Sequence, residues 1–300
     1  MAVYKKTYRP YEGALTPGWR RFLVIPRYAF EDFNRSRFLS LFFLGSFLYP
    51  LVCILLIYIS HNASVLSLLN AQSAARMISV NVTFFMTLLG WQSILALFMT
   101  AFIGPGLVSP DLANDALALY LARPFSRVEY VASKMFVLVV LLSLMTWVPG
   151  LLVFGLQGYL EGGTWMADNW RFASGIFFGG WIWVLILSLL ALALSAWVKW
   201  KPAAGALMFG VFFVAAGFGA TINGVQRTYW GHLFNIGYLI GSVWVELFEG
   251  SERTTNGAIF FRAPRGETVP LWCSWMALAA LCGICLYMLA RKIRGREVVK

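Results

Sequence analysis

The amino-acid sequence predicts an all-α, polytopic integral membrane protein with six transmembrane helices. Hydrophobic residues make up 60% of the 300 residues and charged residues only 12%, whereas soluble domains carry about 25% charged residues. The mean hydropathy is +0.71. The apolar residues gather in six runs of about 20 residues or more, the length that an α-helix needs to cross a bilayer. Composition, hydropathy and run length therefore indicate the same class of fold.

Residues 1–37 precede the first apolar run, and we expect them to form a cytoplasmic tail followed by an amphipathic interfacial helix. From residue 18 onward, arginines alternate with aromatic and aliphatic residues at roughly helical spacing. A helix of this kind lies in the plane of the membrane, with its apolar side chains in the acyl boundary and its arginines among the headgroups.

The transmembrane domain is predicted to cover residues 38–290. Its six spans are expected at residues 38–60, 79–103, 131–157, 174–198, 203–223 and 269–290. The Pro149-Gly150 pair predicts a kink in the third span. Residues 224–268 form a long outer connection, and its apolar half, 229–245, is too short to cross a bilayer. We interpret that half as re-entrant or interfacial. Residues 291–300 form a basic cytoplasmic tail.

Six spans place both termini on the same side of the membrane. That side holds 18 of the 24 Lys and Arg residues and 7 of the 13 acids, which accounts for the whole net charge of +11. An excess of basic residues is typical of cytoplasmic loops. Both termini, and the connection between the second and third spans, are therefore predicted to be cytoplasmic. Because orientation explains the charge, we expect no nucleic-acid partner.

The connection between spans two and three is the most polar stretch within the membrane domain. The Gly-Pro-Gly of residues 104–106 is expected to end the preceding helix. Ser109 is the predicted N-cap of a new helix, with Pro110 and Asp111 in its first turn. The Arg-Pro of residues 123–124 is expected to end it. The pattern thus predicts a short helix at about 110–123, lying at the membrane surface.

The sequence offers few groups for catalysis or metal binding. Asp111 and Asp115 share one helix face and suit a metal ion, but acids also stabilise a helix N-terminus through its dipole, and we favour that interpretation. The two histidines, His61 and His232, fall in outer connections and are interpreted as solvated. No catalytic, metal-binding or cofactor-binding residue is predicted in this chain. The P-loop pattern G-x-x-x-x-G-K-[ST] does not occur in the sequence, so any ATP hydrolysis would need another subunit.

The polar stretch resembles the cytoplasmic signature of the ABC type-2 permease family, the membrane subunits of ATP-binding cassette exporters. The resemblance is carried by the residues Ser109, Pro110, Asp111, Asp115, Tyr120, Arg123, Pro124, Arg127, Tyr130 and Lys134. The order of the parts is also similar: a basic interfacial helix, a pair of spans, this cytoplasmic stretch, and a long outer connection before the last span.

The resemblance implies that residues 110–123 form a coupling helix that docks onto a separate ATPase subunit. The implied docking residues are Asp111, Leu112, Asp115, Ala116, Leu119, Tyr120, Arg123 and Arg127. The spacing of these residues agrees with a docking helix, because the apolar members of this set fall on a single helical stripe between charged ends. ATP and Mg would bind to the partner, a P-loop ATPase in two copies. A second permease chain, identical or different, would complete a complex in the cell's inner membrane.

Two other functions remain open at this point. The chain could be an integral membrane enzyme acting on lipid, or a membrane anchor subunit that transports nothing. Co-purification with a P-loop ATPase favours the permease, whereas activity of the isolated chain on a lipid favours the enzyme. The sequence does not identify the transported substrate.

Overall fold

The computed structural model describes residues 18–62, 80–114, 126–249 and 269–293. Within these ranges every regular element is a helix, which confirms the all-α prediction. The helices are α1 (Gly18–Arg35), α2 (Arg37–Ser46), α3 (Leu48–His61), α6 (Val82–Ala113), α8 (Arg127–Met145), α9 (Trp147–Glu161), α10 (Gly163–Asp168), α11 (Trp170–Trp197), α12 (Lys201–Gln226), the 3₁₀-helix η1 (Trp230–Phe234), α13 (Ile236–Glu249) and α14 (Leu271–Lys292).

In the described part of the chain, six helical stretches are long and apolar enough to cross a membrane. They are Arg37–His61, Val82–Asp111, Arg127–Glu161, Trp170–Trp197, Lys201–Gln226 and Leu271–Lys292. The first consists of α2 and α3, and the third of α8 and α9. The prediction of six transmembrane helices is therefore confirmed.

Prolines divide the first and third spans into two helices each. Pro50 and Pro149 are both the third residue of the helix that contains them, and the interruptions lie at Phe47 and Thr146. A proline ring clashes with the carbonyl four residues earlier, so the chain breaks one turn before the proline. The kink that we expected at Pro149-Gly150 accordingly lies at Thr146.

A side chain of α6 satisfies the backbone at the first of these interruptions. Pro50 has no N–H to offer to the carbonyl of Ser46, four residues earlier. The Nε2 of Gln92, whose side chain is completely buried, donates to that carbonyl at 2.9 Å. In an apolar interior this bond replaces the missing helical donor and fixes the first span against α6.

The expectation that residues 104–106 end the second span is wrong. The helix α6 continues through Pro105 and Pro110 to Ala113. Pro105 leaves the carbonyl of Ala101 without its helical donor, and Gly205 of α12 lies directly against that carbonyl. A Cβ atom at position 205 would stand only 2.7 Å from the Ala101 oxygen. Neighbouring helices can thus accommodate a proline that would end an isolated helix.

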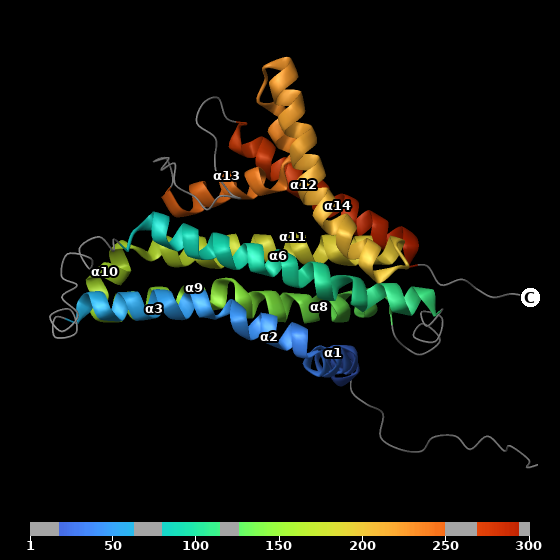
Figure 1. Ribbon diagram of the computed structural model, residues 1–300, viewed down its shortest axis with the longest axis horizontal. Coiled ribbons are helices and arrows are strands. Elements are labelled where there is room, and N and C mark those ends of the chain that lie inside the picture. Colours follow the sequence, from blue (N-terminus) through green and yellow to red (C-terminus); the bar gives the residue numbers. More distant parts are fainter. Residues whose placement is uncertain (1–17, 63–79, 115–125, 250–268, 294–300) are drawn as a thin grey trace, which may run out of the picture.

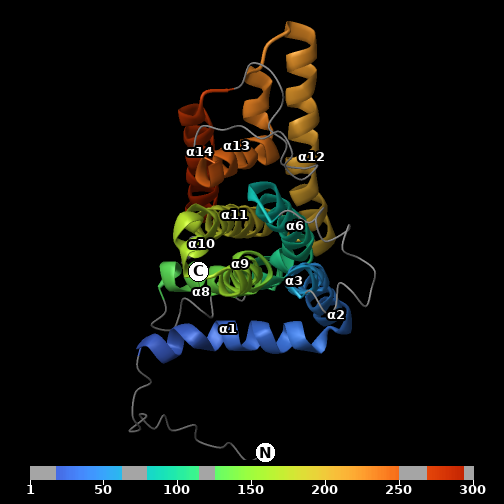
Figure 2. The ribbon, with the colours of Figure 1, turned by 90° about the vertical axis from the view of Figure 1, so that its left-hand side faces the viewer.

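The helices α6 and α11 run side by side through the middle of the molecule (Figures 1 and 2). The indole N–H of Trp183 in α11 donates to the Ser93 carbonyl of α6 at 3.0 Å. Below them in Figure 2 lie α8 and α9 with α2 and α3, and above them lie α12, α13 and α14. Of the six spans, α11 is the most deeply buried, so it forms the core around which the others pack.

The helix α1 lies across the bundle rather than along it. Figure 1 shows α1 nearly end-on, whereas the spans α3, α6 and α11 extend lengthwise. Phe22 of α1 packs edge-to-face on Phe136 of α8, with ring centroids 5.8 Å apart. The side chains of Arg27 and Arg35 are exposed. One side of α1 therefore contacts the bundle, while Arg27 and Arg35 are exposed to the surroundings.

The connection before the last span contains a helix that lies along α11. The 14 residues of α13 are fewer than a bilayer crossing requires. Trp244 and Phe248 of α13 pack on the helix backbone at Gly179 and Gly175 of α11, and the indole N–H of Trp244 donates to the Gly179 carbonyl at 3.1 Å. Any side chain at these glycines would occupy the space of the two rings.

Candidate functional site

The structure places three of the eight predicted docking residues. Asp111 and Leu112 lie in the last turn of α6, and Arg127 is the first residue of α8. The other five fall outside the described residues: Asp115, Ala116, Leu119, Tyr120 and Arg123. The predicted start of a separate helix at residue 110 is wrong, because residues 110–113 continue α6 without a break. The rest of that predicted helix, residues 115–123, lies outside the described residues.

Ser109 does not cap a new helix, contrary to the prediction. It lies inside α6, where it is fully buried, and bonds to the last turn of α11. Its hydroxyl lies 2.7 Å from the Val198 carbonyl and 3.0 Å from the Ser195 carbonyl. The carbonyls at a helix C-terminus lack helical donors. Ser109 therefore caps α11 from the neighbouring helix.

The helix α8 begins with a capping box. The Ser126 hydroxyl accepts from the backbone N–H of Glu129 at 3.1 Å, and the Glu129 carboxylate accepts from the backbone N–H of Ser126 at 2.7 Å. These reciprocal bonds satisfy two N–H groups that a helix start leaves without helical partners. The start of α8 at Arg127, and with it the direction of the first turns, is thereby fixed.

One carboxylate joins the end of α6 to the first two turns of α8. The Oδ2 atom of Asp111 accepts from the hydroxyl of Tyr130 at 2.7 Å and from Nζ of Lys134 at 2.9 Å. The same Nζ lies 5.7 Å from the centre of the Tyr130 ring. Since Tyr130 and Lys134 are four residues apart, they project from one face of α8. We call these three residues the α6–α8 joint.

The α6–α8 joint is shielded from solvent. Tyr130 is completely buried, and the side chains of Lys134 and Asp111 are 10% and 17% exposed. Removing one member of a buried ion pair leaves an unpaired charge and typically costs about 3–5 kcal/mol. The Tyr130 hydroxyl supplies a further hydrogen bond to the carboxylate, so the buried charges are both paired and hydrogen-bonded.

The sequence-based selection of site residues included Asp111 but not Tyr130 or Lys134. Both belong to the pattern behind the family resemblance, yet neither was given a role. Their i, i+4 spacing next to a nearby acid was the available signal. Arg127, one of the predicted docking residues, is exposed.

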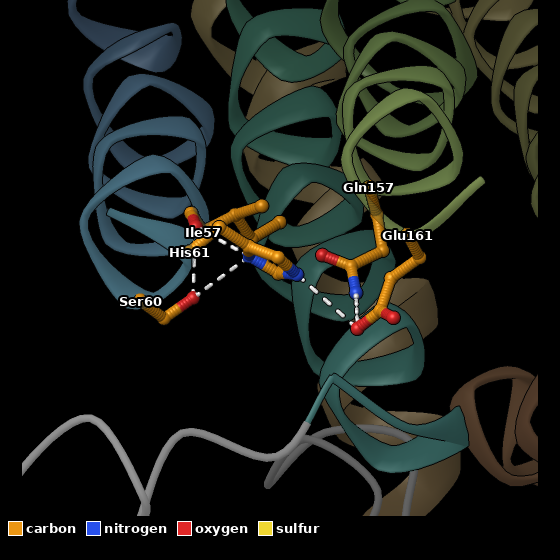
Figure 3. Close-up of polar contacts among 5 residues, drawn as sticks. All are labelled: Ile57, Ser60, His61, Gln157 and Glu161. Atoms are coloured by element: carbon orange, nitrogen blue, oxygen red, sulfur yellow. Dashed lines mark hydrogen bonds and ion pairs between the residues drawn. The ribbon is translucent and has the colours of Figure 1, made fainter. Parts of the chain in front are cut away.

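A second polar contact lies at the opposite end of the bundle, between α3 and α9 (Figure 3). The Nε2 of His61 lies 3.1 Å from the Glu161 carboxylate, which also accepts from Gln157 at 3.3 Å. The Nδ1 of His61 faces the Ile57 carbonyl at 2.9 Å. His61 is exposed, in line with the interpretation as a solvated residue, but it does not lie in a loop: it is the last residue of α3 and connects the first span to the third.

His232 is not a solvated loop residue. It belongs to η1 and stacks on the ring of Tyr238, with ring centroids 4.4 Å apart. Burial lowers the pKa of His232 below its ordinary 6.5. The hydroxyl of Tyr238 in turn accepts from the backbone N–H of Val269 at 3.2 Å. This aromatic pair thus connects η1 and α13 to Val269, just before the last span.

The arrangement provides joints between helices and no cluster suited to a metal ion. In the described ranges, no three His, Cys, Asp or Glu side chains come together in a way that could hold a metal. The Asp111 carboxylate, which the sequence offered as a possible metal ligand together with Asp115, already accepts from Tyr130 and Lys134. The geometry ties the end of α6 to the start of α8.

A family model described as "ABC-2 family transporter protein" matches residues 74–245 of the chain. The match covers more than half of the sequence and includes α6, α8, α9, α11 and α12 with the α6–α8 joint. No curated protein matches the chain significantly. Together with six helices long and apolar enough to span a membrane, this match shows that the chain is a multi-pass membrane protein belonging to the ABC-2 family of transporter proteins.

Proposed function

We propose that this chain is the transmembrane permease subunit of an ATP-binding cassette exporter, and that the connection between α6 and α8 docks a separate P-loop ATPase. In this proposal ATP and Mg bind to the ATPase, and two permease chains assemble with two ATPase chains. The observation that carries the proposal is the α6–α8 joint, in which Asp111 holds the two ends of the connection together.

The joint suits the transfer of movement from a docked partner. ATP binding closes the two ATPases of such a complex, and the movement must reach the spans through the docked connection. Asp111 lies on the last turn of α6, and its partners lie on the first two turns of α8. A displacement of the connection would therefore move spans two and three together.

The distribution of charge supports a cytoplasmic position for the joint. The ends of α6, α11 and α14 and the starts of α8 and α12 lie at the same end of the bundle (Figure 1). Basic residues gather in the described part of that end: Arg127, Lys134, Lys199, Lys201, Arg291 and Lys292. Such an excess favours the cytoplasm. The complex would then lie in the inner membrane with both termini of this chain in the cytoplasm.

The placement of α1 agrees with an interfacial helix on the same side. It lies across the bundle near the end that holds the α6–α8 joint (Figure 1). In this proposal its exposed Arg27 and Arg35 face headgroups, while Phe22 and Phe33 anchor it on the spans.

Co-purification of the tagged chain from its native membranes tests this proposal. We expect a P-loop ATPase to accompany the chain through a mild detergent, and the complex to hydrolyse ATP. The isolated chain should hydrolyse none. A complex without any P-loop ATPase, or ATP turnover by the rigorously purified chain alone, would contradict the proposal. Hydrolysis of a lipid by the isolated chain would instead favour a membrane enzyme.

Two substitutions locate the docking site on the chain. Leu112→Asp adds an acid beside Asp111 on the face that we expect to be apolar, and Tyr120→Ala removes an aromatic anchor that can contribute about 2 kcal/mol or more to an interface. Both variants should insert in the membrane and lose the ATPase. Tyr159→Ala is the matched control, because Tyr159 is exposed on α9 near the opposite end of the bundle. It should retain the ATPase.

A further inference from the structure

We propose that Tyr130 and Lys134 are positioning residues that transmit ATPase movement through Asp111 into the core of the bundle. The inference rests on the proposed function and describes the path by which the movement would reach the spans. Movement of the docked connection would pass to Asp111, from there to α8 through Tyr130 and Lys134, and to α11 through Ser109.

The first part of the route has little freedom to absorb movement. The capping box of Ser126 and Glu129 fixes the start of α8. One turn later Tyr130 is completely buried, so its ring cannot turn away without shifting the helix. Its hydroxyl and Nζ of Lys134 meet the same carboxylate oxygen. Asp111 and the first turns of α8 therefore form one rigid unit.

The second part of the route leads from α6 to the centre of the molecule. Ser109 lies two residues before Asp111, and both its backbone N–H and its hydroxyl bond to the last turn of α11. The Ser195 hydroxyl also donates to the Pro105 carbonyl at 3.2 Å. Since α11 is the most buried span, a movement that reaches it also reaches the helices packed around it.

The chemistry of the joint favours a positional role over a purely stabilising one. A buried ion pair adds little net folding stability, because burying the charges offsets much of their attraction. Apolar side chains of similar size would fill this space at least as well. Charge-assisted hydrogen bonds, however, are directional and hold two helices in one register. A joint that carries movement needs such a fixed register.

The experiment uses the complex of this chain with its co-purifying ATPase and a variant that should fold without the ion pair. The double variant Asp111→Asn, Lys134→Met removes both charges, so no unpaired charge remains buried. The asparagine still offers an oxygen to the Tyr130 hydroxyl. Tyr130→Phe removes only the hydroxyl and leaves the ring in place. The control His61→Gln, Glu161→Gln neutralises the polar contact at the opposite end of the bundle.

Hydrogen–deuterium exchange is measured for each complex with and without ATP plus orthovanadate, which holds the ATPases closed. In the parent we expect nucleotide to change the deuterium uptake of peptides from α6, α8 and α11. The resemblance places Asp111 among the docking residues, but its carboxylate is bonded to Tyr130 and Lys134. In the double variant the ATPase should therefore remain bound and change as in the parent, while the response of those three helices is lost. Tyr130→Phe should weaken the response, and the control should retain it. In every variant, the melting temperature and the hydrogen–deuterium exchange measured without nucleotide should equal those of the parent.

Each other outcome has a defined meaning. If the double variant responds to nucleotide like the parent, the joint does not transmit movement. If it loses the ATPase, the residues serve docking, and their transmitting role is contradicted as well. If the control loses the response equally, the effect is not specific to the joint, which also overturns the inference. If the parent binds no ATPase, the proposed function itself fails.

Discussion

The backbone N–H of Ser109 donates to Oγ of Ser195 at 2.9 Å, and the same Oγ donates to the Pro105 carbonyl at 3.2 Å. A hydroxyl of α11 thus bridges a donor and an acceptor that lie four residues apart in α6. Helix–helix bonds of this kind position spans in an apolar environment, where unsatisfied backbone groups are costly.

Replacing Ser195 by alanine should therefore destabilise the bundle. The buried N–H of Ser109 and the Pro105 carbonyl would both lose a partner, at a cost of about 1 kcal/mol. The free energy of unfolding in detergent micelles, measured by titration with a denaturing surfactant, checks this. Thr221→Ala is the control, because Thr221 is exposed and bonds only within α12. Equal stability of both variants would show that the bridge contributes nothing.

Replacement by alanine should have opposite effects on stability at Gly104 and Gly106 of α6. A Cβ at Gly104 would stand 2.7 Å from Cβ of Ala191, whereas a Cβ at Gly106 meets nothing within 4 Å. Gly104→Ala should destabilise by about 1–3 kcal/mol through overpacking, and Gly106→Ala should be neutral or slightly stabilising. Adding Ala191→Gly to Gly104→Ala should recover most of the lost stability. Thermal unfolding of the four proteins measures this, and a Gly104→Ala variant as stable as the parent would refute the close packing.

His232 should make η1 and α13 sensitive to acid. Since burial lowers its pKa below 6.5, the unfolded chain takes up a proton at a higher pH than the folded chain. The stability contributed by neutral His232 is therefore complete above the ordinary titration range and is lost as the pH falls through it. His232→Phe, which keeps a ring on Tyr238, should reduce the fall in melting temperature between about pH 7.5 and about pH 5.5. An equal fall in melting temperature in the variant and the parent would contradict this.

The predicted topology can be tested with single cysteines and a membrane-impermeant thiol reagent. A cysteine at Asn169, between α10 and α11, should be labelled in intact cells. A cysteine at Ser126, the N-cap of α8, should be labelled only after the membrane is opened. Labelling of position 126 from outside would reverse the orientation inferred from the basic residues.

The spans could be predicted from the sequence, whereas the C-terminal end of α6 could not. Length and hydropathy determine which stretches cross a membrane, and these are properties of each stretch alone. The end of α6 was misplaced because the sequence rule for proline applies to an isolated helix. In the structure, α6 continues past Pro105 and packs closely on Gly205 of α12, a contact that depends on tertiary packing.

The candidate site could be predicted only in part for the same reason. The family resemblance directed attention to Asp111, but its pairing with Tyr130 bridges 19 residues of sequence. Which residues meet there depends on how far α6 extends, and the Gly-Pro-Gly pattern predicts an end to that helix that lies too early. The contact of His61 with Glu161 bridges 100 residues, and no local pattern indicates it.

The most direct test of the account is photo-crosslinking from position 120 in native membranes. A photoreactive phenylalanine analogue replaces Tyr120 in one variant and Tyr159, exposed near the opposite end of the bundle, in another. If the connection between α6 and α8 docks a P-loop ATPase, illumination should join the chain to that ATPase from position 120 and not from position 159. A crosslink to the ATPase from position 159, or none from position 120 in a complex that retains its ATPase, would contradict the account.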